Sequence, residues 1–255
     1  MRVTVLGSSA SYPGAGRACA GHYVEGGGAR VLFDCGNGTI ANLARVEDPV
    51  GLDAVFVTHN HVDHYADIYA LHAALQFAPD GPRGPVPLYA PPGLAHVIKG
   101  LLSERGAESF DEAFVAMPLE AGVPVTIGEL TVTPIAVEHT EPTFALVTDA
   151  DDARFTYTSD TAPCGGAREA AKDADLLLAE ATLPEAYAGA APHMTATEAG
   201  QLAKESGARA LALVHVWPTN DRAEMARLAT EAFGATVVVA DELDVFEIHT
   251  PGRDD

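Results

Sequence analysis

The sequence predicts an α/β protein built as a four-layer sandwich, in which two β-sheets face each other and helices cover both outer faces. Short apolar runs rich in Val, Ile, Leu, Phe and Tyr recur along all 255 residues and are typical of strands. Helical patterns lie between some of these runs. The first half is strand-rich and then helical, and the second half repeats that order, which favours two similar layers over one large sheet.

The strands come first in the prediction because they outnumber the helices. A turn at residues 127–130, Ile-Gly-Glu-Leu, is expected to join two of them as a hairpin. The expected strands are residues 2–7, 22–26, 30–34, 53–59, 86–91, 123–128, 130–139, 143–149, 154–160, 175–180, 210–216, 236–240 and 244–249.

Five helices are expected between these strands. One of them has clear end signals, because Thr195 and Glu198 form a capping box and Gly207 is a suitable stop. The expected helices are residues 63–77, 93–103, 166–172, 195–206 and 219–232.

Length and composition favour one compact domain over residues 1–255. Hydrophobic residues make up 47% of the chain, Gly and Pro are not pooled in a linker, and the loop at residues 77–87 is short. No run of about 18 apolar residues occurs, and the first ten residues resemble a strand more than a signal peptide. We therefore expect a cytoplasmic protein with no membrane partner.

The three cysteines, Cys19, Cys35 and Cys164, are odd in number and show no Cys-x-x-Cys spacing. This pattern argues against a disulfide framework or a cysteine zinc site. We expect these side chains to be small buried hydrophobes.

The charge excludes one class of partner. The chain carries 36 acidic and 15 basic residues, a formal net charge of −21, and has no basic run. Surfaces that follow the phosphates of long nucleic acids need clustered Lys and Arg. Long nucleic acid is therefore an unlikely partner, whereas the oligomeric state, including a homodimer, stays open.

Residues 57–68, VTHNHVDHYADI, place metal-capable side chains directly after an apolar strand. His59 and His61 are two residues apart and should point to the same side, and Asp63 and His64 follow on the turn into the next helix. A single His-x-His would be weak evidence. Four ligand types in six residues at a strand end indicate a metal site.

Three further strands end in ligand-capable residues, His139, Asp160 and His215. Sites at strand ends are common in layered α/β folds. The seven residues suit two divalent ions, and nitrogen and carboxylate donors without thiolate favour zinc, with manganese or iron as alternatives. One ion would take His59, His61 and His139, the other would take Asp63, His64 and His215, and Asp160 would bridge them.

The motif HNHVDH resembles the His-x-His-x-Asp-His signature of the metallo-β-lactamase superfamily, and the three later ligands follow in that family's order. The resemblance covers nearly the whole chain. It implies the metallo-β-lactamase fold and a hydrolytic, usually dinuclear, site in which Asp63 counts as a catalytic residue as well as a ligand. Asp34, in LFDCG, would then support the site, although a plain turn carboxylate explains it equally well.

Two further segments resemble the RNase Z branch and related phosphodiesterases. Residues 192–208 are similar to the element in which a histidine before a helix donates a proton to the leaving oxygen, here His193. Residues 176–182 are similar to the loop whose glutamate holds that histidine, here Glu180. Ala179 and Met194 depart from the family's histidine and serine, which puts the RNA-specific details in doubt.

The span from His139 to Asp160 is too short for the protruding arm with which RNase Z grips tRNA, and the family's basic loop is absent. The compact form resembles actinobacterial-type cyclic-nucleotide phosphodiesterases. The sequence therefore predicts a metal-dependent phosphodiesterase that acts on a small phosphodiester, with a cyclic nucleotide as one candidate. The alternatives are a tRNA 3′-processing endoribonuclease (RNase Z), a lactonase or thioesterase on the same metals, and a non-catalytic ligand-binding module.

Overall fold

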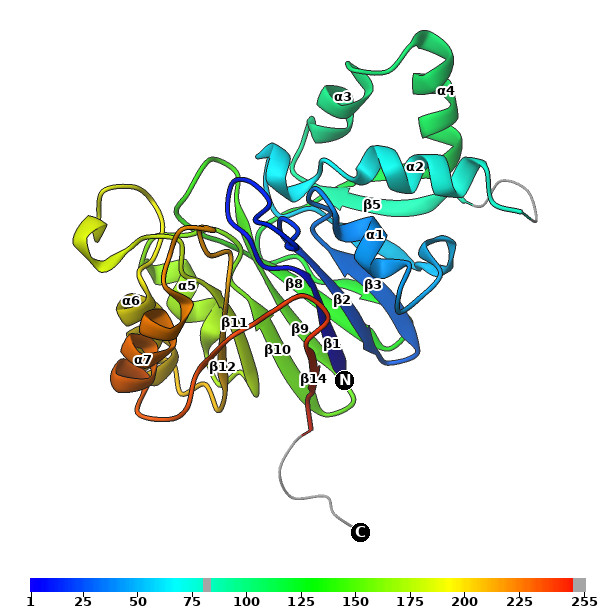
Figure 1. Ribbon diagram of the computed structural model, residues 1–255. Coiled ribbons are helices and arrows are strands. Elements are labelled where there is room, and N and C mark those ends of the chain that lie inside the picture. Colours follow the sequence, from blue (N-terminus) through cyan, green and yellow to red (C-terminus); the bar gives the residue numbers. More distant parts are fainter. Residues whose placement is uncertain (80–83, 250–255) are drawn as a thin grey trace.

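Two seven-stranded sheets face each other and helices cover both outer faces, so the predicted four-layer sandwich is confirmed (Figure 1). The computed structural model describes residues 1–79 and 84–249. The first sheet, in spatial order, contains β14 (Val245–Glu247), β1 (Arg2–Gly7), β2 (Gly21–Gly26), β3 (Ala29–Phe33), β4 (Ala54–Phe56), β5 (Val86–Ala90) and β6 (Phe114–Pro118). The second sheet contains β13 (Val238–Val239), β12 (Leu211–Val214), β11 (Leu176–Glu180), β10 (Ala153–Tyr157), β9 (Phe144–Ala150), β8 (Leu130–Ala136) and β7 (Val125–Ile127).

The helices are divided between the two outer faces. The first four pack on the first sheet, where Leu32 and Val55 meet them, and the last three pack on the second sheet, where Leu177 and Leu213 meet them. The helices are α1 (Thr39–Leu43), α2 (Ile68–Gln76), α3 (Leu94–Lys99), α4 (Glu104–Ala113), α5 (Gly165–Ala171), α6 (Ala196–Glu205) and α7 (Arg222–Phe233). Three single turns of 3₁₀ helix are η1 (Pro49–Gly51), η2 (Val62–His64) and η3 (Glu185–Tyr187).

The central strands read as continuous apolar runs because both of their faces are buried. In β4, Ala54 and Phe56 point into the core between the sheets, whereas Val55 points outward to the helices. In β11, Leu178 faces the inner core and Leu177 faces the outer helices. Because of this alternation, each central strand packs against the opposite sheet with one face and against the helices with the other.

Strand direction determines where functional residues gather. Strands β3, β4, β5 and β6 run parallel in the first sheet, and β10, β11, β12 and β13 run parallel in the second. The hairpins β7–β8 and β8–β9 are antiparallel, so β8 runs in the same direction as β10. The carboxyl ends of these strands therefore meet at one edge of the sandwich.

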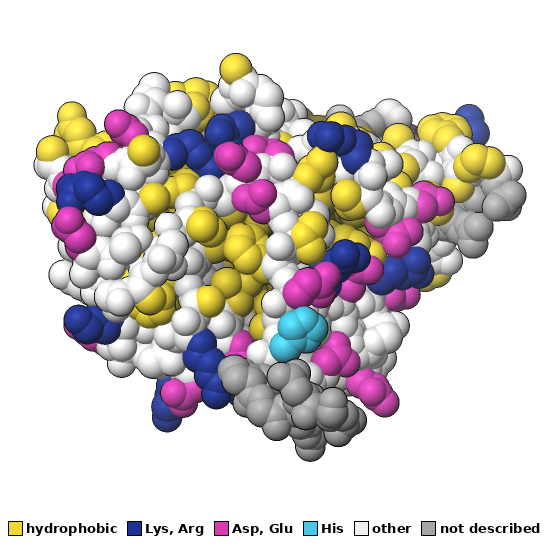
Figure 2. All heavy atoms as spheres, turned by 60° about the horizontal axis from the view of Figure 1, so that its bottom comes forward, with side chains coloured by type: hydrophobic (Ala, Val, Ile, Leu, Met, Phe, Trp, Pro, Cys, Tyr) yellow, Lys and Arg dark blue, Asp and Glu magenta, His cyan; other side chains and the backbone are white. Residues whose placement is uncertain are grey.

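The opposite edge holds a hollow of about 370 Å³ between the starts of β11 and β12 and strand β14. Leu176, Ala210, Val245 and Phe246 are among the residues that line it. Figure 2 shows hydrophobic side chains in the middle of this face, with charged side chains around them. The metal-capable residues follow the other ends of the strands, so this hollow is separate from them.

The helical predictions needed correction at their ends. The helix expected at 63–77 begins at Ile68, because residues 62–64 form the single turn η2 and Tyr65 leaves helical geometry with φ at −142°. The helix expected at 93–103 ends at Lys99, because Ser103 starts α4 by accepting a hydrogen bond from Gly106 N. The last helix begins at Arg222 rather than 219, because Asp221 caps it.

Two helices, α1 and α4, and one strand, β6, were missed. Helix α1 has only five residues, α4 carries Phe110 as its one large apolar side chain, and four of the five residues of β6 are exposed. The hairpin at 127–130 is confirmed, with Ile127 paired to Leu130 across Gly128, whose φ is +61°. Part of the expected loop at 77–87 lies outside the described residues. Within the described part of the chain, every helix is too short or too polar to cross a membrane.

Candidate metal centre

The seven metal-capable residues lie together at the edge where the strands end. His59 follows β4 and His139 follows β8, while Asp160 follows β10 and His215 follows β12. The HNHVDH segment supplies the others, because η2 turns the chain immediately after His61. Residues as far apart in the sequence as Asp63 and His215 thus face one another. The side-chain donor atoms form two groups, and a third group, made of Asp160, His193 and His215, links them.

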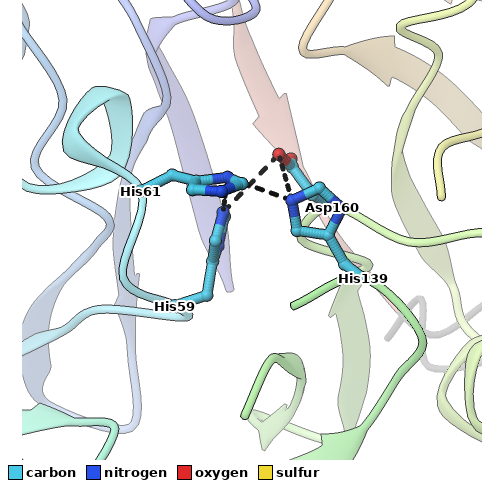
Figure 3. A group of neighbouring side chains, drawn as sticks. All are labelled: His59, His61, His139 and Asp160. Carbon is cyan, nitrogen blue, oxygen red and sulfur yellow. Dashed lines mark hydrogen bonds and ion pairs between the residues drawn. The ribbon is translucent and has the colours of Figure 1, made fainter. Parts of the chain in front are cut away.

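The first group contains His59, His61, His139 and Asp160, whose donor atoms point toward a common centre (Figure 3). His61 Nδ1 lies 3.1 Å from His59 Nε2 and 3.0 Å from His139 Nε2. Asp160 Oδ2 lies 3.6 Å from His59 Nε2 and 3.7 Å from His139 Nε2. Three imidazole nitrogens and one carboxylate oxygen therefore enclose one point.

The second group contains Asp63, His64 and His215. His215 Nε2 lies 3.3 Å from both His64 Nε2 and Asp63 Oδ2, and His64 Nε2 lies 3.7 Å from Asp63 Oδ2. Asp160 Oδ2 is 3.4 Å from His64 Nε2. The same carboxylate oxygen thus borders both groups, which is the placement expected of a bridging ligand.

The donor set fits divalent cations. In a tetrahedral zinc site, bonds of about 2.1 Å place the donor atoms about 3.4 Å apart. The observed separations, from 3.0 to 3.7 Å, lie around that value. Asp160 Oδ1 is also buried with no hydrogen-bond partner among the described residues, although His215 Nδ1 lies 3.2 Å away. A buried carboxylate left in this way indicates a missing positive charge.

Four of the five ligand-type histidines have their Nδ1 proton bound to the protein. His64 Nδ1 donates to Asp34 Oδ2 at 2.7 Å, and His139 Nδ1 donates to the carbonyl of Pro192 at 3.0 Å. The Nδ1 atoms of His59 and His215 face threonine hydroxyls, those of Thr58 and Thr182. Each of these contacts leaves the Nε2 lone pair directed into the cluster, as metal binding requires.

The protonation states favour the same interpretation. Burial raises the pKa of Asp160, but His215 and His64 outweigh it and hold that pKa well below its usual value. Burial also raises the pKa of Asp63, and the neighbouring His215 and His64 lower it overall. Burial lowers the pKa of His59 well below its ordinary range. The carboxylates are therefore ionised and His59 is neutral, which are the forms that bind metal. Burial lowers the pKa of His64, but Asp160 and Asp34 raise it well above its ordinary value overall, so metal binding there would release a proton.

His193 lies beside this cluster, and its ring centroid is 4.6 Å from that of His139. Its Nδ1 donates to Glu180 Oε1 at 2.7 Å. Glu180 is fully buried at the end of β11 and also accepts hydrogen bonds from the backbone N–H groups of Thr161 and Thr182. Burial lowers the pKa of His193, but the hydrogen bond and charge of Glu180 raise it above its ordinary value overall.

Ala179 and Met194, the two departures from the family pattern, lie away from the metal-capable side chains. Ala179 and Met194 are completely buried in the apolar layer between the second sheet and its helices. They therefore do not disturb the hydrogen bond between His193 and Glu180. Asp34 is also fully buried and contacts His64 directly, so it is more than a turn carboxylate.

The supporting residues were mostly missed. Thr58, Thr182, Tyr157 and the carbonyl of Pro192 are all in contact with a metal-type histidine or with Asp34. Only Thr58 gave a signal in the sequence, because it directly precedes the first histidine of the motif. The others come from distant strands and a loop, which only the fold brings together.

Comparisons with known proteins agree on one family. The sequence model of the family described as "Beta-lactamase superfamily domain" matches residues 29–216. The uncharacterized protein Rv1339 of Mycobacterium tuberculosis is 32% identical over 259 positions, covering 99% of this chain and 94% of that protein. A Ribonuclease Z of Halorubrum lacusprofundi is 30% identical over 310 positions, covering 100% of this chain and 99% of that protein.

Among solved structures, the metallo-beta-lactamase fold protein YhfI of Bacillus subtilis superposes with a TM-score of 0.86 at 27% identity. The match covers 96% of this chain and 98% of YhfI. The alignment with Ribonuclease Z needs 310 positions, whereas this chain has 255 residues. That relative therefore carries insertions that this chain lacks.

Proposed function

The chain belongs to the beta-lactamase superfamily. Within this family, we propose that it is a two-metal phosphodiesterase that hydrolyses small phosphodiesters. Cyclic nucleotides are the candidate substrate class. Membership makes it a metal-dependent hydrolase. The observation that supports the finer proposal is the His193–Glu180 pair beside the metal-type cluster. A leaving alkoxide needs a proton, and a positioned histidine is a suitable donor.

The ions proposed are two zinc ions within one hydrolase domain, with manganese or iron as alternatives. His59, His61 and His139 would hold one ion, Asp63, His64 and His215 would hold the other, and Asp160 would contact both. When bound, such a pair supplies charge stabilisation at the phosphate oxygens and a water of lowered pKa as nucleophile.

The protein's own residues handle the leaving group. Glu180 holds His193 through Nδ1, which directs Nε2 away from the carboxylate and favours the protonated ring. In this proposal, Nε2 of His193 gives its proton to the departing oxygen. Glu180 is itself held by two backbone N–H groups, so the ring has one orientation. Catalysis by such a positioned acid contributes roughly 100- to 10,000-fold.

RNase Z is the second candidate, because the relative from Halorubrum lacusprofundi carries that name and is 30% identical over the whole chain. Two observations favour the small substrate instead. The segment between His139 and Asp160 contains β9 and β10, which pair directly through residues 150 and 153 and leave no room for an arm. The net charge of −21 also opposes binding of a polyanion.

A hydrolysis screen tests the proposal. Protein loaded with zinc or manganese would be given bis-(p-nitrophenyl) phosphate, cyclic nucleotides, a lactone, a thioester and a precursor tRNA. We expect turnover of the small phosphodiesters and weak or absent cleavage of the tRNA. Efficient, specific 3′ processing of the tRNA would establish RNase Z instead. Preference for the lactone or thioester would replace the phosphodiesterase, and inactivity on all five would favour a non-catalytic binding module.

A further inference from the structure

One buried carboxylate, Asp34, contacts the second group of metal-capable residues directly and is linked to the first group through Thr58. Asp34 lies at the end of β3 with no exposed surface, and its Oδ1 accepts a hydrogen bond from Thr58 N at 2.8 Å. Its Oδ2 accepts from three donors, namely His64 Nδ1 at 2.7 Å, Thr58 Oγ1 at 3.0 Å and Tyr157 Oη at 3.0 Å. The contact with His64 is direct and reaches the second group.

The contact with the first group passes through the hydroxyl of Thr58. An ionised carboxylate can only accept, so the single proton of Thr58 Oγ1 is donated to Asp34. The same oxygen lies 3.1 Å from His59 Nδ1 and must therefore accept the proton of that nitrogen. Ser159 Oγ is farther from it, at 3.5 Å. The relay thus fixes the His59 tautomer whose Nε2 lone pair points into the first group.

A second threonine, Thr182, fixes the tautomer of His215 in the same way. The hydroxyl of Thr182 donates to the backbone carbonyl of His215 at 3.0 Å, so it accepts from His215 Nδ1 at 2.8 Å. This leaves the Nε2 lone pair of His215 directed at Asp63 and His64. Thr182 makes no contact with the first group among the hydrogen bonds of the described residues.

We propose that Thr58 and Thr182 are positioning residues that each govern one of the two metal positions, and that Asp34 supports both. Thr58 orients His59 in the first group, Thr182 orients His215 in the second, and Asp34 reaches the second directly and the first through Thr58. The proposal rests on the two-ion site of the proposed function. It adds that the two positions can be weakened separately by removing one hydroxyl group each.

The test is a titration of metal-free protein with Co²⁺, followed by calorimetry and by the visible spectrum of the bound ion. Two variants serve as references: His61→Ala disables the first position and Asp63→Ala disables the second. Thr58→Val and Thr182→Val keep the shape of the side chain and remove the hydroxyl. Loss of such a contact typically costs 10- to 100-fold in metal affinity, so we expect roughly that loss in one binding event.

The pattern of loss decides the proposal. Thr58→Val should weaken the event that His61→Ala abolishes, Thr182→Val should weaken the event that Asp63→Ala abolishes, and Asp34→Asn should weaken both. Thr58→Ser and Thr182→Ser retain a hydroxyl and should restore most of the affinity. Circular dichroism of each variant separates loss of affinity from loss of fold.

Two outcomes would overturn the proposal in different ways. If the unaltered protein binds two Co²⁺ ions but either valine variant weakens both events equally, or neither, the assignment of one threonine to each position fails. The two-ion site would then stand. If the unaltered protein binds fewer than two ions, the two-ion site and this proposal both fail. Absence of phosphodiesterase activity with normal titrations would reject only the proposed reaction.

Discussion

His193 is bound on one side by Glu180 and lies against His139 on another, so its role can be tested through the leaving group of the substrate. His193→Ala should keep metal content and fold. It should slow hydrolysis of phosphodiesters with alkoxide leaving groups by roughly 100- to 10,000-fold, and p-nitrophenyl esters much less, because p-nitrophenolate barely needs a proton.

Steady-state rates on both substrate types measure the loss in His193→Ala. The variant His96→Ala, at an exposed histidine, serves as the control. Equal losses on both substrates would mean that His193 positions the substrate. Unchanged rates on both substrates would mean that His193 has no catalytic role and is simply a histidine beside a helix cap.

A different histidine, His22, makes the folded state less stable at acidic pH. His22 is fully buried between the sheets, edge-on to Tyr157, and neither ring nitrogen has a hydrogen-bond partner among the described residues. Burial, followed by the charges of His64 and His215, lowers its pKa from 6.5 to about 3. Below pH 6.5 the unfolded chain therefore binds a proton that the folded chain refuses, and stability falls as the pH drops toward 3.

His22→Phe should remove this acid sensitivity. Between pH 7 and pH 5, the metal-free variant should lose about 2 kcal/mol less of its unfolding free energy than the unaltered protein. Urea unfolding of both metal-free proteins at the two pH values measures the difference. Equal losses in both proteins would show that His22 is protonated in the folded state or is hydrogen-bonded to water.

The sequence revealed the seven metal-capable residues because their chemistry is concentrated and repeated at strand ends. His59, His61, Asp63 and His64 fall within six positions, and the structure places them with His139, Asp160 and His215. The threonine and tyrosine supports could not be predicted in this way. A hydroxyl near a histidine in space has no fixed spacing in the chain, so Thr182 and Tyr157 were found only through the fold.

At the scale of elements, the packing of α6 against α7 depends on one glycine. A Cβ added at Gly200 would lie 2.6 Å from the carbonyl oxygen of Ala229 and 2.8 Å from Ala232 Cβ, so the two helices would have to separate. Gly200→Ala should cost about 1–3 kcal/mol of unfolding free energy, as overpacking does. Because α6 begins three residues after His193, the substitution should also reduce turnover.

Gly165→Ala, at the first residue of α5, is the matched control, since nothing lies within 4 Å of a Cβ there. It should be neutral or slightly stabilising, because alanine favours helix over glycine by up to about 1 kcal/mol. Denaturant unfolding of the two variants compares them. Similar stabilities would show that α6 and α7 can separate at no cost.

The central strands were predicted from the sequence because burial on both faces sets their pattern. Strands such as β4 and β11 read as unbroken apolar runs because each faces a core on either side. The elements it missed lie at the margins. Strand β6 is an edge strand with four of its five residues exposed, so it lacks an alternation of apolar and polar residues. Helix α4 has an apolar face, but Phe110 is the one large side chain on it, which makes the pattern easy to overlook.

At the scale of the whole molecule, the cluster joins the two halves of the sandwich. The first sheet contributes His59, His61, Asp63 and His64, and the second contributes His139, Asp160 and His215. Ions bound there should therefore resist separation of the sheets, because binding to the folded state alone stabilises it. Protein purified without chelator should contain about two divalent ions per chain, and their removal should lower its melting temperature.

Elemental analysis and thermal unfolding before and after chelation measure both effects. Empty positions after purification would not contradict the prediction, since purification can strip metal, so reconstitution with zinc is part of the experiment. A saturated chain that binds one ion only, or a melting temperature unaffected by chelation, would contradict it.

The net charge of −21 acts on every substrate that approaches the molecule. An anionic phosphodiester enters a field of its own sign, and salt shortens the reach of that field from roughly 30 Å at 0.01 M to roughly 10 Å at 0.1 M. The value of kcat/KM for a small anionic phosphodiester should therefore rise a few-fold across this range of ionic strength. An uncharged ester serves as the control and should show no such rise.

A basic nucleic-acid enzyme behaves in the opposite way, because salt weakens its hold on phosphates. If kcat/KM fell steeply with salt, a local positive surface would be guiding the substrate, and the case against an RNA substrate would lose its electrostatic support.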